Sequence, residues 1–237
     1  MKRLILAVPI IALSGCVSNA VVHGSGTEVE VSMSSAGIEH IEISGIGELT
    51  LQPNDSQSST LLISGDDNLV ERLHIERKGN RLIIKPKNRF PNTWVQNTPL
   101  TYALNHNVKS VEISGSADLV ADDIAQPSFE LDISGSSTAQ LGLSVEQLDI
   151  DISGSGRIYA DGSAQNVELE IKGSGRLYAP RLQGSEADLD VVGSGRVEIG
   201  EYSLLDVSAV GSAKVYYSGE PMINSSAVGS ATVMPIY

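Results

Sequence analysis

The sequence predicts an all-β protein that folds as a right-handed parallel β-helix, or β-solenoid, with coils of 18–20 residues. Two observations carry this prediction: a short motif recurs at nearly constant spacing, and apolar and polar residues alternate around it. The motif is a Gly-Ser pair, and successive pairs are 20, 19, 19, 20, 18 and 18 residues apart. The seven pairs begin at Gly115, Gly135, Gly154, Gly173, Gly193, Gly211 and Gly229.

The alternation extends to both sides of each glycine. Around Gly154, the apolar residues Ile150, Ile152 and Ile158 stand four before, two before and four after it, and most other repeats carry apolar residues there. A period of two indicates a strand with one buried face. Each repeat therefore predicts a strand, a turn at G-S-G, G-S-A or G-S-S, and a second strand. We expect the glycine and the small residue two positions further on to point inward.

A repeat of this length cannot enclose a core by itself, but it can when it stacks on copies of itself. Equivalent positions then lie about 4.8 Å apart in parallel ladders. Crossovers between parallel strands are overwhelmingly right-handed, which sets the expected hand of the coils. The regular region, residues 108–237, predicts roughly seven coils. An antiparallel β-sandwich is the alternative, whereas the blade of a β-propeller needs about twice this period.

The chain before the regular repeats keeps the pattern only loosely, and we expect residues 35–107 to form irregular coils and a loop. Ile41–Gly45 and Leu61–Gly65 show the same strand-to-glycine ending, twenty residues apart. Residues 66–73 predict a helical turn, and Gly79-Asn80 predicts a turn before a strand at residues 81–85. Residues 86–107 are rich in Pro and Asn, which predicts a long loop with one weak strand.

The N-terminus has the pattern of a secretory signal. Lys2 and Arg3 precede an apolar run of ten residues, which is too short to span a bilayer. The run ends in L-S-G-C, which resembles the lipobox of bacterial lipoproteins. This resemblance implies a signal peptide at residues 1–15, a lipid on the thiol of Cys16 and a membrane-anchored tether at residues 16–34. Val17 follows in place of the Asp that commonly retains such proteins at the inner membrane, so the resemblance implies the outer membrane.

Charge and motif content exclude several classes of function. A formal net charge of −13 argues against nucleic acid as a partner, because no broad basic surface is available to neutralise phosphates. The four histidines show no metal-ligand spacing, and no G-x-S-x-G nucleophile elbow is present. The G-S-G turns precede strands and not helices, so they do not predict a phosphate-binding loop. We therefore predict no catalytic residues, no cofactor and no metal site.

Two outward columns of charge accompany the strands. The position three before each glycine is mostly acidic, and calcium would relieve the repulsion, although a solvent-screened column is the simpler interpretation. These acidic residues are Glu112, Asp132, Asp151, Glu170 and Asp190. The positions three and five after the glycine form a basic and aromatic stripe, which is our candidate ligand-contact face for sugars or acidic polysaccharide. Its members are Arg157, Tyr159, Arg176, Tyr178, Arg196, Lys214 and Tyr216, with Glu198 replacing tyrosine in one repeat.

Two further features allow alternative interpretations. Trp94, the only tryptophan, stands in the predicted loop, where it either contacts a ligand or packs the loop against the core. The last coil ends at residues 231–237 without a predicted capping helix, and an open strand edge invites pairing. We therefore expect self-association or a covering partner at this end, unless Pro235 blunts the edge.

The repeated I-S-G-S and K-G-S-G-R-L endings, the strand G-N-R-L-I-I-K-P at residues 79–86 and the finish Y-Y-S-G-E-P…S-S-A-V-G-S-A at residues 216–231 resemble the bacterial head GIN domain family. The resemblance covers roughly residues 35–237. It implies a β-solenoid in the cell envelope, often behind a lipoprotein signal, with the label of an auto-transporter adhesin and no catalytic site.

The combined expectation is a non-catalytic envelope lipoprotein that acts as an adhesin or as a surface module binding glycan or an envelope protein. A polysaccharide-active enzyme on a parallel β-helix is the alternative, and it rests on fold analogy. A ligand-binding subunit of an envelope signalling system, with its ligand at the Trp94 loop, is the third interpretation.

Overall fold

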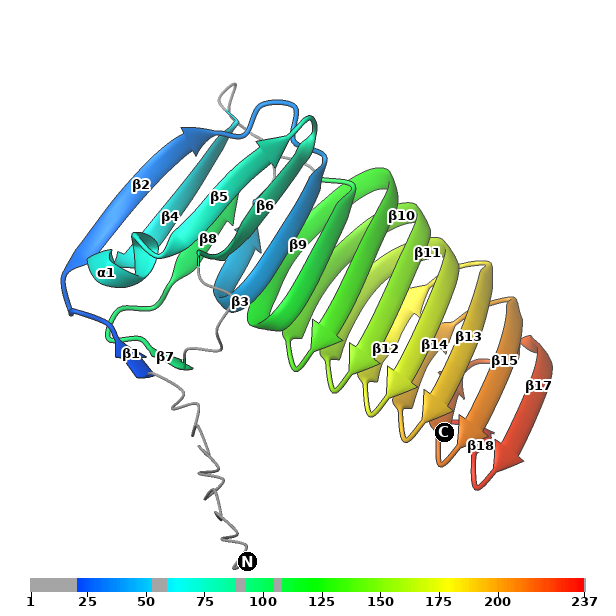
Figure 1. The fold of residues 1–237 in the computed structure, drawn as a ribbon. Coiled ribbons are helices and arrows are strands. Elements are labelled where there is room, and N and C mark those ends of the chain that lie inside the picture. The colour runs from blue at the N-terminus through cyan, green and yellow to red at the C-terminus, as the bar shows by residue number, and fades with distance from the viewer. Residues whose placement is uncertain (1–20, 53–58, 88–92, 105–107, 237) are drawn as a thin grey trace, which may run out of the picture.

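The computed structural model describes residues 21–52, 59–87, 93–104 and 108–236. Almost all of the regular structure is β, and it forms an elongated stack of coils with a smaller sheet at its N-terminal end (Figure 1). The coil strands are β9 (Ser110–Gly135), β10 (Thr138–Gly154), β11 (Arg157–Gly173), β12 (Arg176–Gln183), β13 (Glu186–Gly193), β14 (Arg196–Glu201), β15 (Leu204–Gly211), β16 (Lys214–Ser218), β17 (Met222–Gly229) and β18 (Thr232–Pro235).

The coil strands pair in parallel, one repeat with the next, which confirms the predicted solenoid. Glycine pairs with glycine through the stack, as in Gly135 with Gly154 and Gly154 with Gly173. The segment before each Gly-Ser pair lies on one face and the segment after it on the opposite face, and the chain winds right-handedly as it advances (Figure 1). The seven Gly-Ser corners enclose about six full turns, against the roughly seven coils predicted.

The corners explain why glycine recurs. At Gly154 the backbone has φ +117°, and a Cβ added there would lie 2.7 Å from the carbonyl oxygen of Gly135 one coil earlier. The following serine continues the ladder through the bend, because the N–H of Ser155 donates to that same oxygen at 2.8 Å. The glycines are exposed or half-buried, so the predicted inward position is wrong for them; only the residue two further on, such as Gly156, is buried.

The core is a set of apolar columns that run through the coils in register. Ile152 and Ile171 are adjacent in one column, and Ile158 and Leu177 in another, and all four side chains are at most 1% exposed. Burying a residue of this size contributes about 1.5–3 kcal/mol. Because the columns are apolar on nearly every coil, stacking supplies the burial that a single coil lacks.

One buried position breaks this pattern and yields a stability prediction. The Ser137 hydroxyl is fully buried two residues after Gly135 and has no hydrogen-bond partner, whereas Ala117 and Ala213 occupy the equivalent place in other coils. A buried, unsatisfied hydroxyl costs about 1–3 kcal/mol. We expect Ser137→Ala to raise the free energy of unfolding by about 1 kcal/mol in urea denaturation. A loss of stability would show that the hydroxyl has a partner.

The N-terminal part contributes one strand to the solenoid, and the residues after that strand do not continue the coils. Strand β3 (His40–Leu51) pairs with β9 in parallel, with Gly45 beside Gly115, so it carries the first corner. The intervening residues form five strands, four of which belong to the same large sheet as the solenoid strands, and one helical turn. These elements are β4 (Thr60–Asp66), α1 (Asp67–Val70), β5 (Leu73–Lys78), β6 (Arg81–Pro86), β7 (Thr93–Val95) and β8 (Thr101–Leu104).

This insertion departs from the loose coils that the sequence predicts. Although Leu61–Gly65 resembles a solenoid repeat, it lies in β4, which pairs antiparallel with β8 and with β2 (Glu28–Ser34). The region predicted as a long loop contains two strands, because β7 pairs with β1 (Val21–His23) and β8 extends the sheet. Half of the expected tether is therefore paired structure. The predicted signal peptide and Cys16 lie outside the described residues.

Asp66 fixes the N-terminal segment to this sheet. Its side chain is fully buried, and its carboxylate accepts N–H groups of Gly26 at 2.8 Å, Asn97 at 2.9 Å and Thr98 at 3.1 Å. Burial by itself raises the pKa of Asp66, but these donors outweigh burial and hold the pKa below its ordinary value. The chain that leads from the N-terminus is thereby held to the loop that follows β7.

Candidate ligand-binding face

The predicted basic and aromatic residues lie together on one face, just past the Gly-Ser corners. Strands β11, β12, β14 and β16 place them in register, so that Arg176 pairs with Arg196 and Tyr178 with Glu198 on neighbouring strands. We call this set the basic ladder. Its members are Arg157, Tyr159, Arg176, Tyr178, Arg196, Glu198, Lys214 and Tyr216.

The ladder is internally ordered by ring and ion contacts. The rings of Tyr159 and Tyr178 stack with centroids 5.3 Å apart and planes 15° from parallel, and Tyr159 remains 45% exposed. Arg196 donates to Glu198 from Nε at 2.8 Å and from Nη2 at 2.6 Å, and its guanidinium lies 4.5 Å from the centre of the Tyr216 ring. The guanidinium of Arg196 therefore already has an ion-pair partner and a ring contact within the protein.

The other three cations of the ladder are free. Arg157, Arg176 and Lys214 form no ion pair with any described residue, whereas the remaining coil cations do: Lys172 pairs with Glu170, and Arg181 with Asp161. The ladder therefore concentrates unpaired positive charge on one face of an acidic protein. Unpaired cations in register are suited to anions that repeat at the spacing of the coils.

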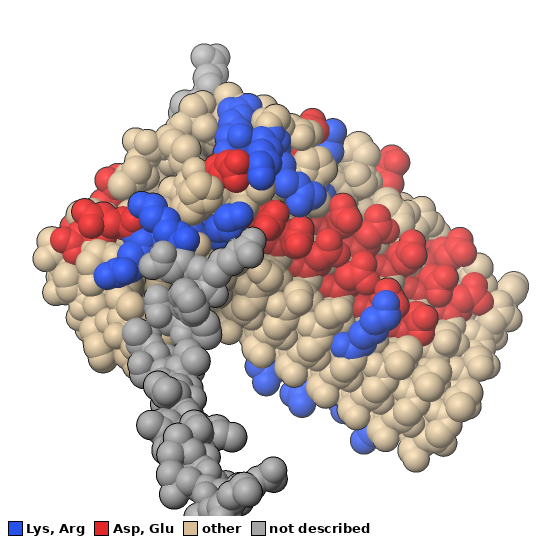
Figure 2. Space-filling model, viewed as in Figure 1, with Lys and Arg blue, Asp and Glu red and all other residues tan. Residues whose placement is uncertain are grey.

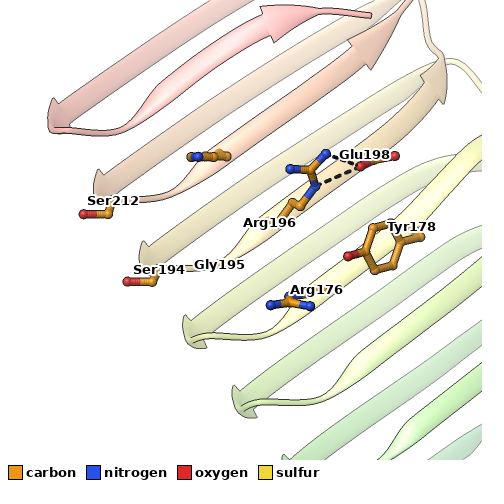
Figure 3. A pocket seen from close by; sticks show the side chains of 8 residues that line it. Arg176, Tyr178, Ser194, Gly195, Arg196, Glu198 and Ser212 are labelled. Atoms are coloured by element: carbon orange, nitrogen blue, oxygen red, sulfur yellow. Dashed lines mark hydrogen bonds and ion pairs between the residues drawn. The ribbon is translucent and has the colours of Figure 1, made fainter.

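A shallow, open depression of about 490 Å³ lies within the ladder. The guanidinium groups of Arg176 and Arg196 and the ring of Tyr178 project around it, and Ser194 and Ser212 stand at its corner edge (Figure 3). Lys214 and Glu198 complete the lining. Charged, hydroxyl and aromatic groups at an open surface fit an extended polar ligand better than a compact apolar one.

The opposite face is acidic, and it carries more charge than the sequence analysis recognised. A second acidic column lies on the same face, two residues before the predicted one along each strand. Asp149, for example, pairs with Glu130 on one neighbouring strand and with Glu168 on the other. The predicted column consists of Glu112, Asp132, Asp151, Glu170 and Asp190. Figure 2 shows the resulting acidic band over β9, β10, β11, β13 and β15. The second column lies five residues before each corner glycine, so alignment of the internal repeats on that glycine reveals it. Its members are Glu130, Asp149, Glu168, Asp188 and Asp206.

Partial burial and the crowding of carboxylates raise the pKa of two of them. Partial burial, together with Glu130, Asp151 and Glu112, raises the pKa of Asp132 to about 6, although Arg81 opposes the shift. Partial burial and neighbouring Glu170 also raise the pKa of Asp151. At neutral pH this band is therefore electrostatically strained.

This strain predicts a pH-dependent stability. The pKa of Asp132 is higher in the folded state than in the unfolded one. Its contribution to the free energy of unfolding therefore becomes more favourable as the pH falls from about 6 to about 4. We expect Asp132→Asn to stabilise the protein by about 1 kcal/mol above pH 7, after allowance for solvent screening. The gain should shrink towards zero near pH 4. Urea denaturation across this range tests it, with Glu28→Gln on β2 as a control; a gain independent of pH would contradict it.

His40, His74 and Trp94, which lie before the regular coils, have identifiable structural contacts. In the part of the chain that the structure describes, no group of three or more His, Cys, Asp or Glu residues comes close enough to hold a metal ion. His40 contacts the Ser110 hydroxyl at 2.6 Å, and His74 lies 3.6 Å from Glu76.

Trp94, in strand β7, is half-buried against the core and lines a cavity of about 60 Å³ with Pro86 and Gly45. Among the described residues, no helix is long and apolar enough to cross a membrane.

The architecture and this face define the class: a parallel β-solenoid with charged outward ladders. The family model described as "Putative auto-transporter adhesin, head GIN domain" matches residues 37–221. The chain belongs to this family.

Solved structures share the fold at low sequence identity. The crystal structure of a putative adhesin from Bacteroides fragilis has a TM-score of 0.81 at 18% identity, covering 91% of this chain and 100% of that chain. A putative lipid binding protein and a putative adhesin from Parabacteroides distasonis have TM-scores of 0.68 and 0.67 at 19% and 23% identity. Each covers 91% of this chain and 99% of the other. A comparison with curated proteins gave no significant match.

Proposed function

We propose that this protein is a non-catalytic, lipid-anchored adhesion module of the cell envelope whose basic ladder binds an acidic glycan. The observation that carries the proposal is the set of three unpaired cations, Arg157, Arg176 and Lys214, aligned beside stacked tyrosines. Family membership supports adhesion as the general role.

The geometry of the ladder favours a repeating anion. Parallel coils lie about 4.8 Å apart, which is close to the length of one sugar unit in an extended chain. Guanidinium groups pair bidentately with carboxylates and sulfates, and the stacked faces of Tyr159 and Tyr178 offer an apolar surface for a sugar ring. Successive acidic sugars would thereby meet successive coils.

The acidic band does not prevent such binding. It lies on the opposite face of the solenoid, before the Gly-Ser corners, while the ladder lies after them. Two stacked sheets are about 10 Å apart, and charges separated by more than about 8 Å are largely screened in physiological salt. The local potential of the ladder therefore outweighs the formal net charge of −13.

A lipid on Cys16 would attach the protein to the membrane near β1, at the N-terminal end of the coil stack. The first described strand, β1, lies at one end of the molecule, and the coils extend from there to β17 at the other end (Figure 1). Asp66 holds the segment after β1 to the fold, so the described chain nearest to Cys16 is fixed to this end of the stack.

A direct binding experiment tests the proposal. We expect the protein to bind an acidic polysaccharide such as polygalacturonate, with an affinity that falls as salt rises, and to bind a neutral glucan much more weakly. Vesicles with anionic headgroups form a second arm, because one structural neighbour carries the description of a lipid binding protein. Equal affinity for neutral and acidic polysaccharide, or binding to vesicles alone, would contradict the proposal. Turnover of the polysaccharide would instead support the enzyme alternative.

A further inference from the structure

The last coil differs from the others because it has lost its charge. Residues 221–236 contain no Asp, Glu, Lys or Arg. In the strand register, Asn224 lies beside Asp206 of the acidic column, and Thr232 lies beside Lys214 of the basic ladder. On a chain of net charge −13, this end is the surface where two copies meet with the least repulsion.

The same coil exposes apolar side chains. Met222 is 74% exposed and Val228 57%, and Met234 and Ile236 are each 40% exposed. Val228 also continues an outward column through the exposed Val210, so an apolar stripe leads to this end of the stack. Apolar surface gathered on one uncharged end is typical of an interaction site.

The backbone of the last coil offers an unused edge. Among the described strands, β17 pairs only with β15, and it forms the outermost strand of the solenoid (Figure 1). The N–H groups of Met222 and Ser230 donate inward, to Ser203 and Gly211. Because alternate residues of a parallel strand face opposite sides, Ile223, Ser225 and Ala227 direct their N–H and C=O groups outward.

We infer that β17 is the interface for a second copy of this chain, which adds its own β17 in antiparallel pairing across a two-fold axis. A two-fold axis reverses strand direction, so identical edges pair antiparallel, and each supplies the neutral apolar surface that the other lacks. Pro235 lies in β18 and removes one N–H there, which leaves β17 as the edge able to pair. With the axis perpendicular to the sheets, the basic ladders of both copies lie on the same side.

The test is the mass of the full chain in solution over a wide range of concentration. Sedimentation or light scattering should show a monomer that converts to a dimer as concentration rises. We expect the double variant Asn224→Asp/Ser226→Asp to weaken dimerisation at least about tenfold, because it places four like charges at the interface. The matched control, Gln165→Glu with Asn166→Asp, adds the same two charges in the middle of the stack on β11 and should leave dimerisation unchanged.

A second variant tests the backbone pairing itself. Ser225→Pro removes an outward N–H without breaking a bond to β15, so it should also weaken dimerisation while circular dichroism shows an intact fold. A constant monomer mass at every concentration would overturn the inference. So would a dimer whose stability is the same in the double variant, the proline variant and the control.

Discussion

Gly135→Ala should destabilise the protein by more than about 3 kcal/mol. Gly135 adopts φ +142°, and a Cβ there would lie 2.1 Å from the carbonyl oxygen of Gly115 on the preceding coil. That oxygen already accepts the N–H of Ser136 at 2.9 Å, so relief of the clash would break the ladder at the corner. Urea denaturation, followed by circular dichroism, measures the loss.

A matched substitution separates the clash from the backbone preference. Gly79 also has positive φ, +64°, but no atom lies within 4 Å of the position of its Cβ. Gly79→Ala should therefore cost only the left-handed backbone penalty, about 1–2 kcal/mol. Equal losses in the two variants would show that close stacking of the corners does not constrain Gly135.

The second large effect is expected in ligand binding. Replacing Arg157, Arg176 and Lys214 together by glutamine should weaken binding of acidic polysaccharide about tenfold to a hundredfold, because each exposed contact with an anion is worth roughly 0.5–1 kcal/mol. Since none of the three forms an ion pair within the described protein, folding should be unaffected. Titration calorimetry on both proteins measures the difference.

The control removes the same charge from other places. Glutamine at Lys78, Lys172 and Arg181 breaks exposed ion pairs with Glu76, Glu170 and Asp161 but leaves the ladder intact. Net charge then matches that of the ladder variant. A similar loss of affinity in both variants would mean that overall charge, and not the ladder, governs binding.

Much of the solenoid could be predicted from sequence because equivalent residues have equivalent neighbours on successive coils. A residue in an alternating column has the same environment on every coil, so the pairing of Arg157 with Arg176 and of Tyr159 with Tyr178 follows from spacing. The second acidic column was equally accessible, since Glu168 and Asp188 stand five residues before their glycines. Because this column shares its face with the predicted one, the two together make the acidic band.

Other features depend on contacts that spacing does not encode. Leu61–Gly65 carries the local pattern of a coil, but its antiparallel partner β8 comes some forty residues later in the chain. Alternation predicts that the corner glycines point inward, but their positive φ places them in the bend, where they are exposed or half-buried. Arg196 is occupied by Glu198, which stands where the neighbouring coils have tyrosine; a single departure from a repeat changes its local chemistry.

Mapping where an acidic oligosaccharide binds tests the central claim most directly. Backbone amide shifts, recorded by NMR during titration with an oligogalacturonate, should change first on β12, β14, β16 and the first residues of β11, around Arg157, Arg176 and Lys214. Strands of the acidic band and the segment around Trp94 should show little change. Shifts centred on Trp94, or spread evenly over the molecule, would contradict the assignment of the basic ladder as the ligand-binding face.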